Sequence, residues 1–132
     1  EYPLVLNVFR PTVFYGGRTA NMPYLLEIAG KNRQVGWESW IEIHRGTASL
    51  YGISDRDMVW VESPLGKIKV RARVDPGTNP EVVSLPFGLG HEVGGRWAKG
   101  LGANPNKLVG IATMAVTGAS AYSVTRVKVY RA

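Results

Sequence analysis

The chain has 132 residues, a hydrophobic content of 45% and a formal net charge of +6. This length supports one domain with a buried core and is too short for two. The absence of cysteine excludes disulfides and thiolate ligands for iron–sulfur clusters or zinc within this chain, and no run of residues approaches the roughly 20 apolar residues of a membrane-spanning helix.

The first strand and the long loop after it come before residue 40. Residues 4–9 are mostly apolar and end before Pro11, which predicts a buried strand that proline terminates. Residues 10–36 are rich in Gly, Asn, Pro and Arg, and only residues 24–29 could form a helical turn. A loop of this length is typically functional or disordered, and its aromatic and apolar residues favour an ordered, packed loop. Residues 40–43 then predict a short strand.

The most regular stretch runs from residue 47 to residue 74. Residues 47–51 predict one or two helical turns that end at Gly52 in a left-handed conformation, with Ile53 returning to the core. In residues 58–63 and 67–74 the side chains alternate strictly, which is typical of strands with one buried face and one wet face. Ser, Pro, Leu and Gly at positions 63–66 are turn residues, so the two strands are expected to form a hairpin.

The C-terminal part adds two strands around irregular segments. Residues 82–86 predict a strand after a turn at 75–77. Residues 87–103 contain six glycines in seventeen residues and cannot form a stable regular element without outside contacts. Residues 112–122 predict a loop, and residues 123–131 alternate again and predict a closing strand. Six or so strands with one or two short helices favour a closed or nearly closed β-barrel, which removes exposed edges.

Positive charge gathers toward the C-terminus. From residue 88 onward, six Lys and Arg residues stand against Glu92 alone. Such an excess indicates an anionic partner, namely nucleic acid, a phosphorylated ligand or an acidic protein face, or else a solvated basic surface. The last third of the chain is therefore where an anion site is expected.

Three runs of residues carry a resemblance to a known family: IEIHRGTASLYGISDRDMVWVESPLGKIKVRARV at 41–74, LVLNVFRP before it and VVSLPFGLGH after it. Together they resemble the molybdopterin dinucleotide-binding domain at the C-terminus of large catalytic subunits in the dimethyl sulfoxide reductase family. The resemblance covers nearly the whole chain and implies a mainly β fold, a six-stranded double-psi β-barrel with one or two short helices. It also implies that residues 1–132 are a single domain and a fragment of a larger oxidoreductase subunit, in keeping with a first residue, Glu1, that is not methionine.

The chain departs from the family pattern at three places. Residues 44–48 read His-Arg-Gly-Thr-Ala where the family commonly has His-Pro-Glu-Asp-Ala, and residues 55–57 read Asp-Arg-Asp where it commonly has Asp-Gly-Asp. An arginine in a left-handed turn costs about 1 kcal/mol relative to glycine. The loop at 13–19 lacks the histidine that many members carry, which affects the pterin-facing contact at that point.

The resemblance also implies where a ligand binds, namely at the loop after the first strand and the loop before the last. A pterin dinucleotide presents a pyrophosphate and heterocycle edges, which call for close backbone amides, cations and amide or hydroxyl donors. The residues that match these needs, and are the candidates for cofactor binding, are Arg10, Gly16, Gly17, Arg18, Thr19, Asn104 and Tyr122.

Several of these residues have a structural interpretation beside the functional one. Arg10 could anchor the long loop through backbone carbonyls, Asn104 could start a turn before its proline, and Tyr122 could be an ordinary tyrosine at the barrel rim. His44 is expected to cap or pack at the short helix, and His91 has no catalytic partner at a telling spacing. The four tryptophans are expected in the core or at subunit contacts.

The resemblance implies a domain that binds molybdopterin guanine dinucleotide, with molybdenum or tungsten held by the rest of the subunit, in a polysulfide or thiosulfate reductase-like branch. The domain would not be catalytic alone and would supply no metal ligand. Implied partners are the remaining domains of the parent subunit, an iron–sulfur subunit and a membrane subunit, in a bacterial complex facing the periplasm.

Two other functions are compatible with the sequence. The alternative within the family is a cofactor-free structural barrel in a quinone-linked respiratory complex, which the missing loop histidine favours. Nucleic-acid binding is suggested only by charge, and it is not expected, because the strand residues Lys67, Lys69, Arg71 and Arg73 have no interleaved aromatics on their face for base stacking.

Overall fold

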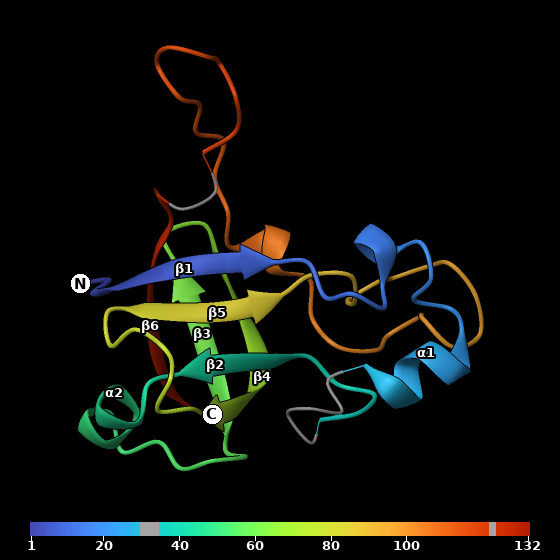
Figure 1. Ribbon diagram of the computed structural model, residues 1–132, viewed down its shortest axis with the longest axis horizontal. Helices are drawn as coiled ribbons and strands as arrows, with labels where there is room; N and C mark the ends of the chain where they lie inside the picture. Colours follow the sequence, from blue (N-terminus) through green and yellow to red (C-terminus); the bar gives the residue numbers. More distant parts are fainter. Residues whose placement is uncertain (30–34, 122–123) are drawn as a thin grey trace.

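A computed structural model describes residues 1–29, 35–121 and 124–132. Its centre is a closed barrel of six strands in the order β1-β5-β2-β4-β3-β6 (Figure 1). The pairs β1–β5 and β2–β4 are parallel, and the other neighbouring pairs are antiparallel. The mainly β, six-stranded double-psi barrel with two short helices is thereby confirmed. The strands are β1 (Leu4–Phe9), β2 (Trp40–Ile43), β3 (Met58–Ser63), β4 (Gly66–Val74), β5 (Val82–Pro86) and β6 (Arg126–Arg131).

The predicted hairpin forms from β3 and β4, with Val61 opposite Ile68 and Ser63 opposite Gly66. The alternating side chains point inward and outward as expected, because β3 and β4 each bury every second residue. One inward residue, Ser63, is polar. Its hydroxyl donates to the Leu108 carbonyl at 2.8 Å and so ties the hairpin to the chain beyond the glycine-rich segment.

The barrel interior is filled by branched aliphatic side chains. Burying one such side chain stabilises a fold by about 1.5–3 kcal/mol relative to leaving it exposed. The fully buried members from the strands are Leu6, Ile41, Ile43, Val59, Val61, Val70, Val83, Leu85 and Val127. The closed interior gives the loops at its ends a rigid base.

The two helices are α1 (Pro23–Ile28) and α2 (Arg45–Leu50). The capping role expected of His44 is confirmed, because its Nδ1 accepts from the Gly46 amide at 3.1 Å at the start of α2. The helix begins two residues earlier than predicted, and Gly52 ends it at a φ of +64°. Arg56 adopts the left-handed conformation, at a φ of +69°, which the family comparison implied. Within the described residues, no helix has the length and apolar character that crossing a bilayer requires.

A second, smaller hydrophobic cluster lies beside the barrel and contains Phe14, Ala20, Leu26, Ala29, Leu89 and Ala98. We call residues 10–29 and 87–103 the loop lobe. Figure 1 shows its parts together at one end of the barrel, where α1 and the segment following β5 meet. The expectation that the long loop is packed is correct for Phe14 and Leu26, but Tyr15 and Tyr24 are 62% and 74% exposed.

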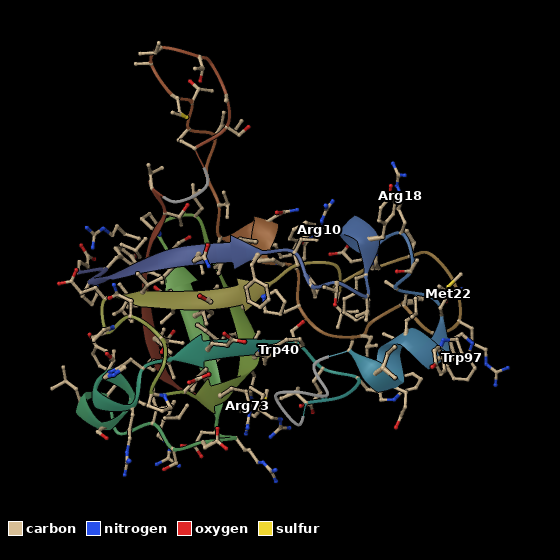
Figure 2. All side chains as sticks on the ribbon, viewed as in Figure 1. Arg10, Arg18, Met22, Trp40, Arg73 and Trp97 are labelled. Carbon is tan, nitrogen blue, oxygen red and sulfur yellow. The ribbon has the colours of Figure 1, made fainter. Side chains whose placement is uncertain are left out.

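Two sequence predictions concern the tryptophans and the segment before the last strand. Of the four tryptophans, only Trp40 is buried in the core, whereas Trp97 is exposed at the surface of the loop lobe (Figure 2). The segment at 112–121 is a projecting arm closed by a bridge between Thr113 and Ser120, and its apolar residue Val116 is exposed. The closing strand begins at Arg126, later than the predicted start at Ser123, which lies outside the described residues.

Candidate functional site

The glycine-rich segment, residues 87–103, is a defined loop and not a regular element. All six of its glycines have positive φ angles. The loop closes on itself through the Gly90 amide, which donates to the Leu101 carbonyl at 2.8 Å, and the Gly100 amide, which donates to the His91 carbonyl at 2.8 Å. The Ser39 hydroxyl, buried just before β2, accepts from the Ala103 amide at 2.9 Å. Outside contacts thus hold a segment that its composition alone could not order.

The first predicted site element, Gly16 to Thr19, lies against this segment. Gly17 is in the one-turn η1 (Tyr15–Gly17), and a Cβ at its position would be 3.4 Å from the Nε2 atom of His91. The imidazole beside this loop therefore comes from the glycine-rich segment, in a chain whose own loop at 13–19 has none. The Thr19 hydroxyl donates to the Val13 carbonyl at 2.7 Å, so it closes the loop on which Gly17 lies.

The second predicted site element, Asn104, lies on the other side of the same segment. Its Oδ1 accepts from the Asn106 amide at 3.0 Å and caps the short η3 (Pro105–Lys107). A Cβ at Gly90 would overlap the backbone of Asn104, so only glycine allows this approach. Because Gly17 and Asn104 both touch residues 88–91, the fold brings the two loops to the same end of the molecule.

The remaining predicted residues are less closely integrated. Arg10 leaves the end of β1 and is exposed, and Arg18 leaves the end of η1 with its guanidinium 5.4 Å from the Tyr15 ring (Figure 2). Neither forms a hydrogen bond to a carbonyl among the described residues. Tyr122 lies outside the described residues.

The structure adds a cavity that sequence reasoning missed. It has a volume of about 550 Å³ and lies between the β3–β4 hairpin and the glycine-rich segment. Asn104 lines it and is the one predicted site residue in the lining among those that the structure describes. Side chains that were not predicted as site residues are Trp60, Lys67, Lys69, His91, Glu92, Lys99 and Lys107. The charge excess in the last third pointed toward Lys99 and Lys107, but no local signal placed the hairpin beside them.

One statement about the strand lysines is wrong. The Trp60 ring lies on their face, with its centroid 4.8 Å from Lys67 Nζ and 5.8 Å from Lys69 Nζ. The aromatic residue comes from the neighbouring strand, where Trp60 is directly opposite Lys69. A search along the lysine-bearing strand alone could not find it.

Two acidic residues of the barrel surface, Glu38 and Glu62, are engaged in pairs. A hydrogen bond from Arg71 lowers the pKa of Glu38, and hydrogen bonds from Tyr130 and Lys128 lower the pKa of Glu62. Across the part of the chain that the structure describes, no group of three or more His, Asp or Glu side chains could hold a metal ion. The chemistry near the site is therefore that of cations, amides and close backbone.

Three proteins with similar sequences are subunits of reductases. The chain is 28% identical over 115 residues to the menaquinone reductase molybdopterin-binding-like subunit of Nitratidesulfovibrio vulgaris, covering 87% of this chain and 17% of the relative. It is 30% identical over 137 residues to the arsenate respiratory reductase molybdopterin-containing subunit ArrA of Shewanella sp. (strain ANA-3), covering 98% and 16%. It is 31% identical over 86 residues to the thiosulfate reductase molybdopterin-containing subunit PhsA of Salmonella typhimurium, covering 65% and 10%.

The fold has a counterpart among solved structures. Acetylene hydratase from Pelobacter acetylenicus superposes with a TM-score of 0.76 at 17% identity, over 99% of this chain and 18% of that chain. This chain therefore spans less than one fifth of the length of each of these four proteins. The family model for the "Molydopterin dinucleotide binding domain" matches residues 4–126. The chain belongs to the molybdopterin dinucleotide-binding domain family.

Proposed function

We propose that this chain binds molybdopterin guanine dinucleotide as one domain of a larger molybdenum or tungsten oxidoreductase. The observation that carries the proposal is that Gly17 and Asn104, which are far apart in the sequence, both lie against the segment 88–91. The chain that brings them there belongs to this family. When bound, the cofactor would supply the redox chemistry, and the protein would supply binding, orientation and electrostatics.

The residues present fit such a ligand. The amide of Asn104 offers a donor and an acceptor, and the cap on η3 uses only its Oδ1. Its Nδ2 has no hydrogen-bond partner among the described residues and is left to donate to a heterocycle edge. The half-buried Gly17 allows close approach of backbone, and the exposed guanidiniums of Arg10 and Arg18 can reach negatively charged phosphates.

In this proposal Asn104 recognises the pterin, while the loop at 16–19 and Arg10 contact the phosphate-bearing part. His91 is a positioning residue for the loop, because its Nε2 lies 3.1 Å from the Gly88 carbonyl and packs against Gly17. Tyr122 is retained as a proposed contact from its match to the family pattern. This chain would then hold and orient the cofactor without supplying a ligand to its metal.

The test separates the two roles of Asn104. Asn104→Ser keeps an oxygen that can cap η3 but removes the amide donor, whereas Asn104→Ala removes both. In the complete gene product we expect Asn104→Ser to lower the pterin bound per protein about tenfold, the effect of one lost hydrogen bond to a buried ligand, with an unchanged unfolding temperature. Pterin content equal to that of the wild type would contradict the role of the amide.

A second function is favoured by one relative. The subunit of Nitratidesulfovibrio vulgaris is named molybdopterin-binding-like and belongs to a menaquinone reductase, which fits a barrel that serves packing in a quinone-linked complex without cofactor. The missing histidine in loop 13–19 points the same way. Analysis of metal and pterin in the complete protein, purified from cells that make the cofactor, decides between the two: a preparation with neither supports the structural barrel.

The branch of oxidoreductases to which the parent protein belongs is also a proposal. The match to a thiosulfate reductase subunit supports a polysulfide or thiosulfate reductase-like branch, with an iron–sulfur subunit and a membrane subunit as partners. An arsenate reductase subunit matches over more of the chain. Reduction assays of the purified complex with thiosulfate, polysulfide and arsenate would separate these branches, and turnover of arsenate alone would reject the proposed one.

A further inference from the structure

The outer face of the β3–β4 hairpin carries two ammonium groups over one aromatic ring. Lys67 and Lys69 are two residues apart on β4 and therefore point to the same face. Their Nζ atoms lie 4.8 Å and 5.8 Å from the centroid of Trp60. Cation–π attraction restrains both flexible side chains at this place. Less conformational entropy is therefore lost when a ligand binds to them.

The opposite side of the cavity brings further cations. Lys99 comes from the glycine-rich segment and Lys107 from η3. The carboxylate in the lining, Glu92, forms an exposed ion pair with Lys107 at 3.2 Å. Among the residues that the structure describes, no carboxylate lies within ion-pair distance of Lys67, Lys69 or Lys99.

The carboxylate opposite Lys67 is hydrogen-bonded to Tyr130 and Lys128, and Lys67 adds only a weaker electrostatic attraction to it. Glu62 lies opposite Lys67 in the strand register, but its carboxylate accepts from Tyr130 Oη at 2.6 Å and pairs with Lys128 at 3.0 Å. The cavity wall therefore keeps an excess of positive charge in a concave site, where the field on an entering anion is strongest.

We propose that this cavity, which we call the lysine cavity, binds a phosphate-type oxyanion through Lys67, Lys69 and Lys99. Lysine ammonium groups are compact point charges that bind phosphate oxygens, and among the described residues the lining brings four of them together against the one carboxylate of Glu92.

The oxyanion could come from two sources with the same chemistry. One is a phosphate group of a bound dinucleotide, and this version rests on the proposed function. The other is a free inorganic anion, and this version does not. The lysine cavity is distinct from loop 16–19 and Arg10, which are absent from its lining.

The experiment uses the complete gene product made in cells that cannot synthesise the pterin. Inorganic pyrophosphate is titrated calorimetrically at low ionic strength, where screening is weak. We expect Lys67→Gln/Lys69→Gln to raise the dissociation constant at least about tenfold, since two charge-assisted contacts are lost. Lys99→Gln tests the opposite wall and is expected to raise it roughly threefold. Arg45→Gln, an exposed site on α2, is the matched control and should leave binding unchanged.

The outcomes separate the inference from the proposed function. If pyrophosphate binds the pterin-free protein but not the cofactor-loaded protein, a cofactor phosphate fills the cavity; if it binds both, the ligand is a free anion. No binding by the wild type, equal binding by the double variant at an unchanged unfolding temperature, or stronger competition by a hexaglutamate peptide than by phosphate would overturn the inference. A native preparation without pterin counts only against the proposed function, because the titration does not depend on it.

Discussion

The barrel and the loop lobe are built in different ways from adjacent parts of the same chain. The barrel has continuous strand ladders around a core of large aliphatic side chains, whereas the lobe clusters small residues such as Ala20 and Ala98 around Phe14 and Leu26. Individual hydrogen bonds and close backbone contacts hold the lobe together. The barrel is thus a rigid base for loops of lower local stability, an arrangement that is common at binding sites.

The largest expected effect is on the barrel core. Leu85 on β5 is fully buried, and Leu85→Ala should lower the free energy of unfolding by about 2–5 kcal/mol, through lost transfer energy and the cavity left behind. Leu65→Ala, at a side chain 63% exposed in the hairpin turn, should stay within about 0.5 kcal/mol of the wild type. Chemical denaturation measures both, and similar losses for the two variants would refute the contrast between core and surface.

The next effect tests whether the lobe can be disrupted alone. Gly94 and Gly95 have φ angles of +112° and +108°, so alanine at either site pays a similar backbone cost of about 1 kcal/mol. A Cβ at Gly95 would also overlap the side chain of Asn21, whereas Gly94 has nothing within 4 Å. Gly95→Ala should therefore speed hydrogen exchange of residues 87–103 well beyond Gly94→Ala, with exchange in the strands unchanged. Equal exchange in both variants would show that contact with Asn21 does not hold the lobe.

A smaller effect concerns the two hydrogen bonds that join residues 10–29 of the lobe to residues 87–103. The Asn21 Oδ1 accepts from the amides of Trp97 and Ala98 at 2.8 Å and 3.2 Å. Asn21→Ala should cost about 1–2 kcal/mol in local opening energy, since each bond contributes about 1 kcal/mol. Asn21→Asp keeps the accepting oxygen and should retain most of the protection. The readout is limited proteolysis within residues 87–103, and a fully protected Asn21→Ala would place the stability of the lobe elsewhere.

The smallest effect concerns pH and the barrel wall. Two hydrogen bonds from Arg71 reach the Glu38 carboxylate and lower its pKa below the usual 4.5. The pair therefore adds stability above pH 4.5 that disappears as the pH falls through the lowered pKa. Both side chains are partly exposed, so the contribution should be below about 1 kcal/mol. Glu38→Gln should flatten the acid limb of a plot of unfolding free energy against pH, and an unchanged acid limb would contradict this pairing.

The strands could be predicted from the sequence because their signals are local. Alternation in β3 and β4 and the turn residues between them depend only on neighbours along the chain, and so does the cap that His44 places on α2. The family could also be recognised from such runs of residues. The loop at 16–19 and Asn104 lie at the same end of the barrel, but cofactor binding by these residues and by Tyr122 stays a prediction.

What the tertiary structure alone decided is which distant residues share a surface. The Trp60 ring meets Lys69 because two strands pair in a particular register, and Lys99 faces the same cavity because outside contacts close a segment that has no periodicity of its own. Gly17, His91 and Asn104 meet for the same reason. Contacts between residues far apart in sequence depend on chain topology and packing, and neither leaves a pattern in any single stretch of residues.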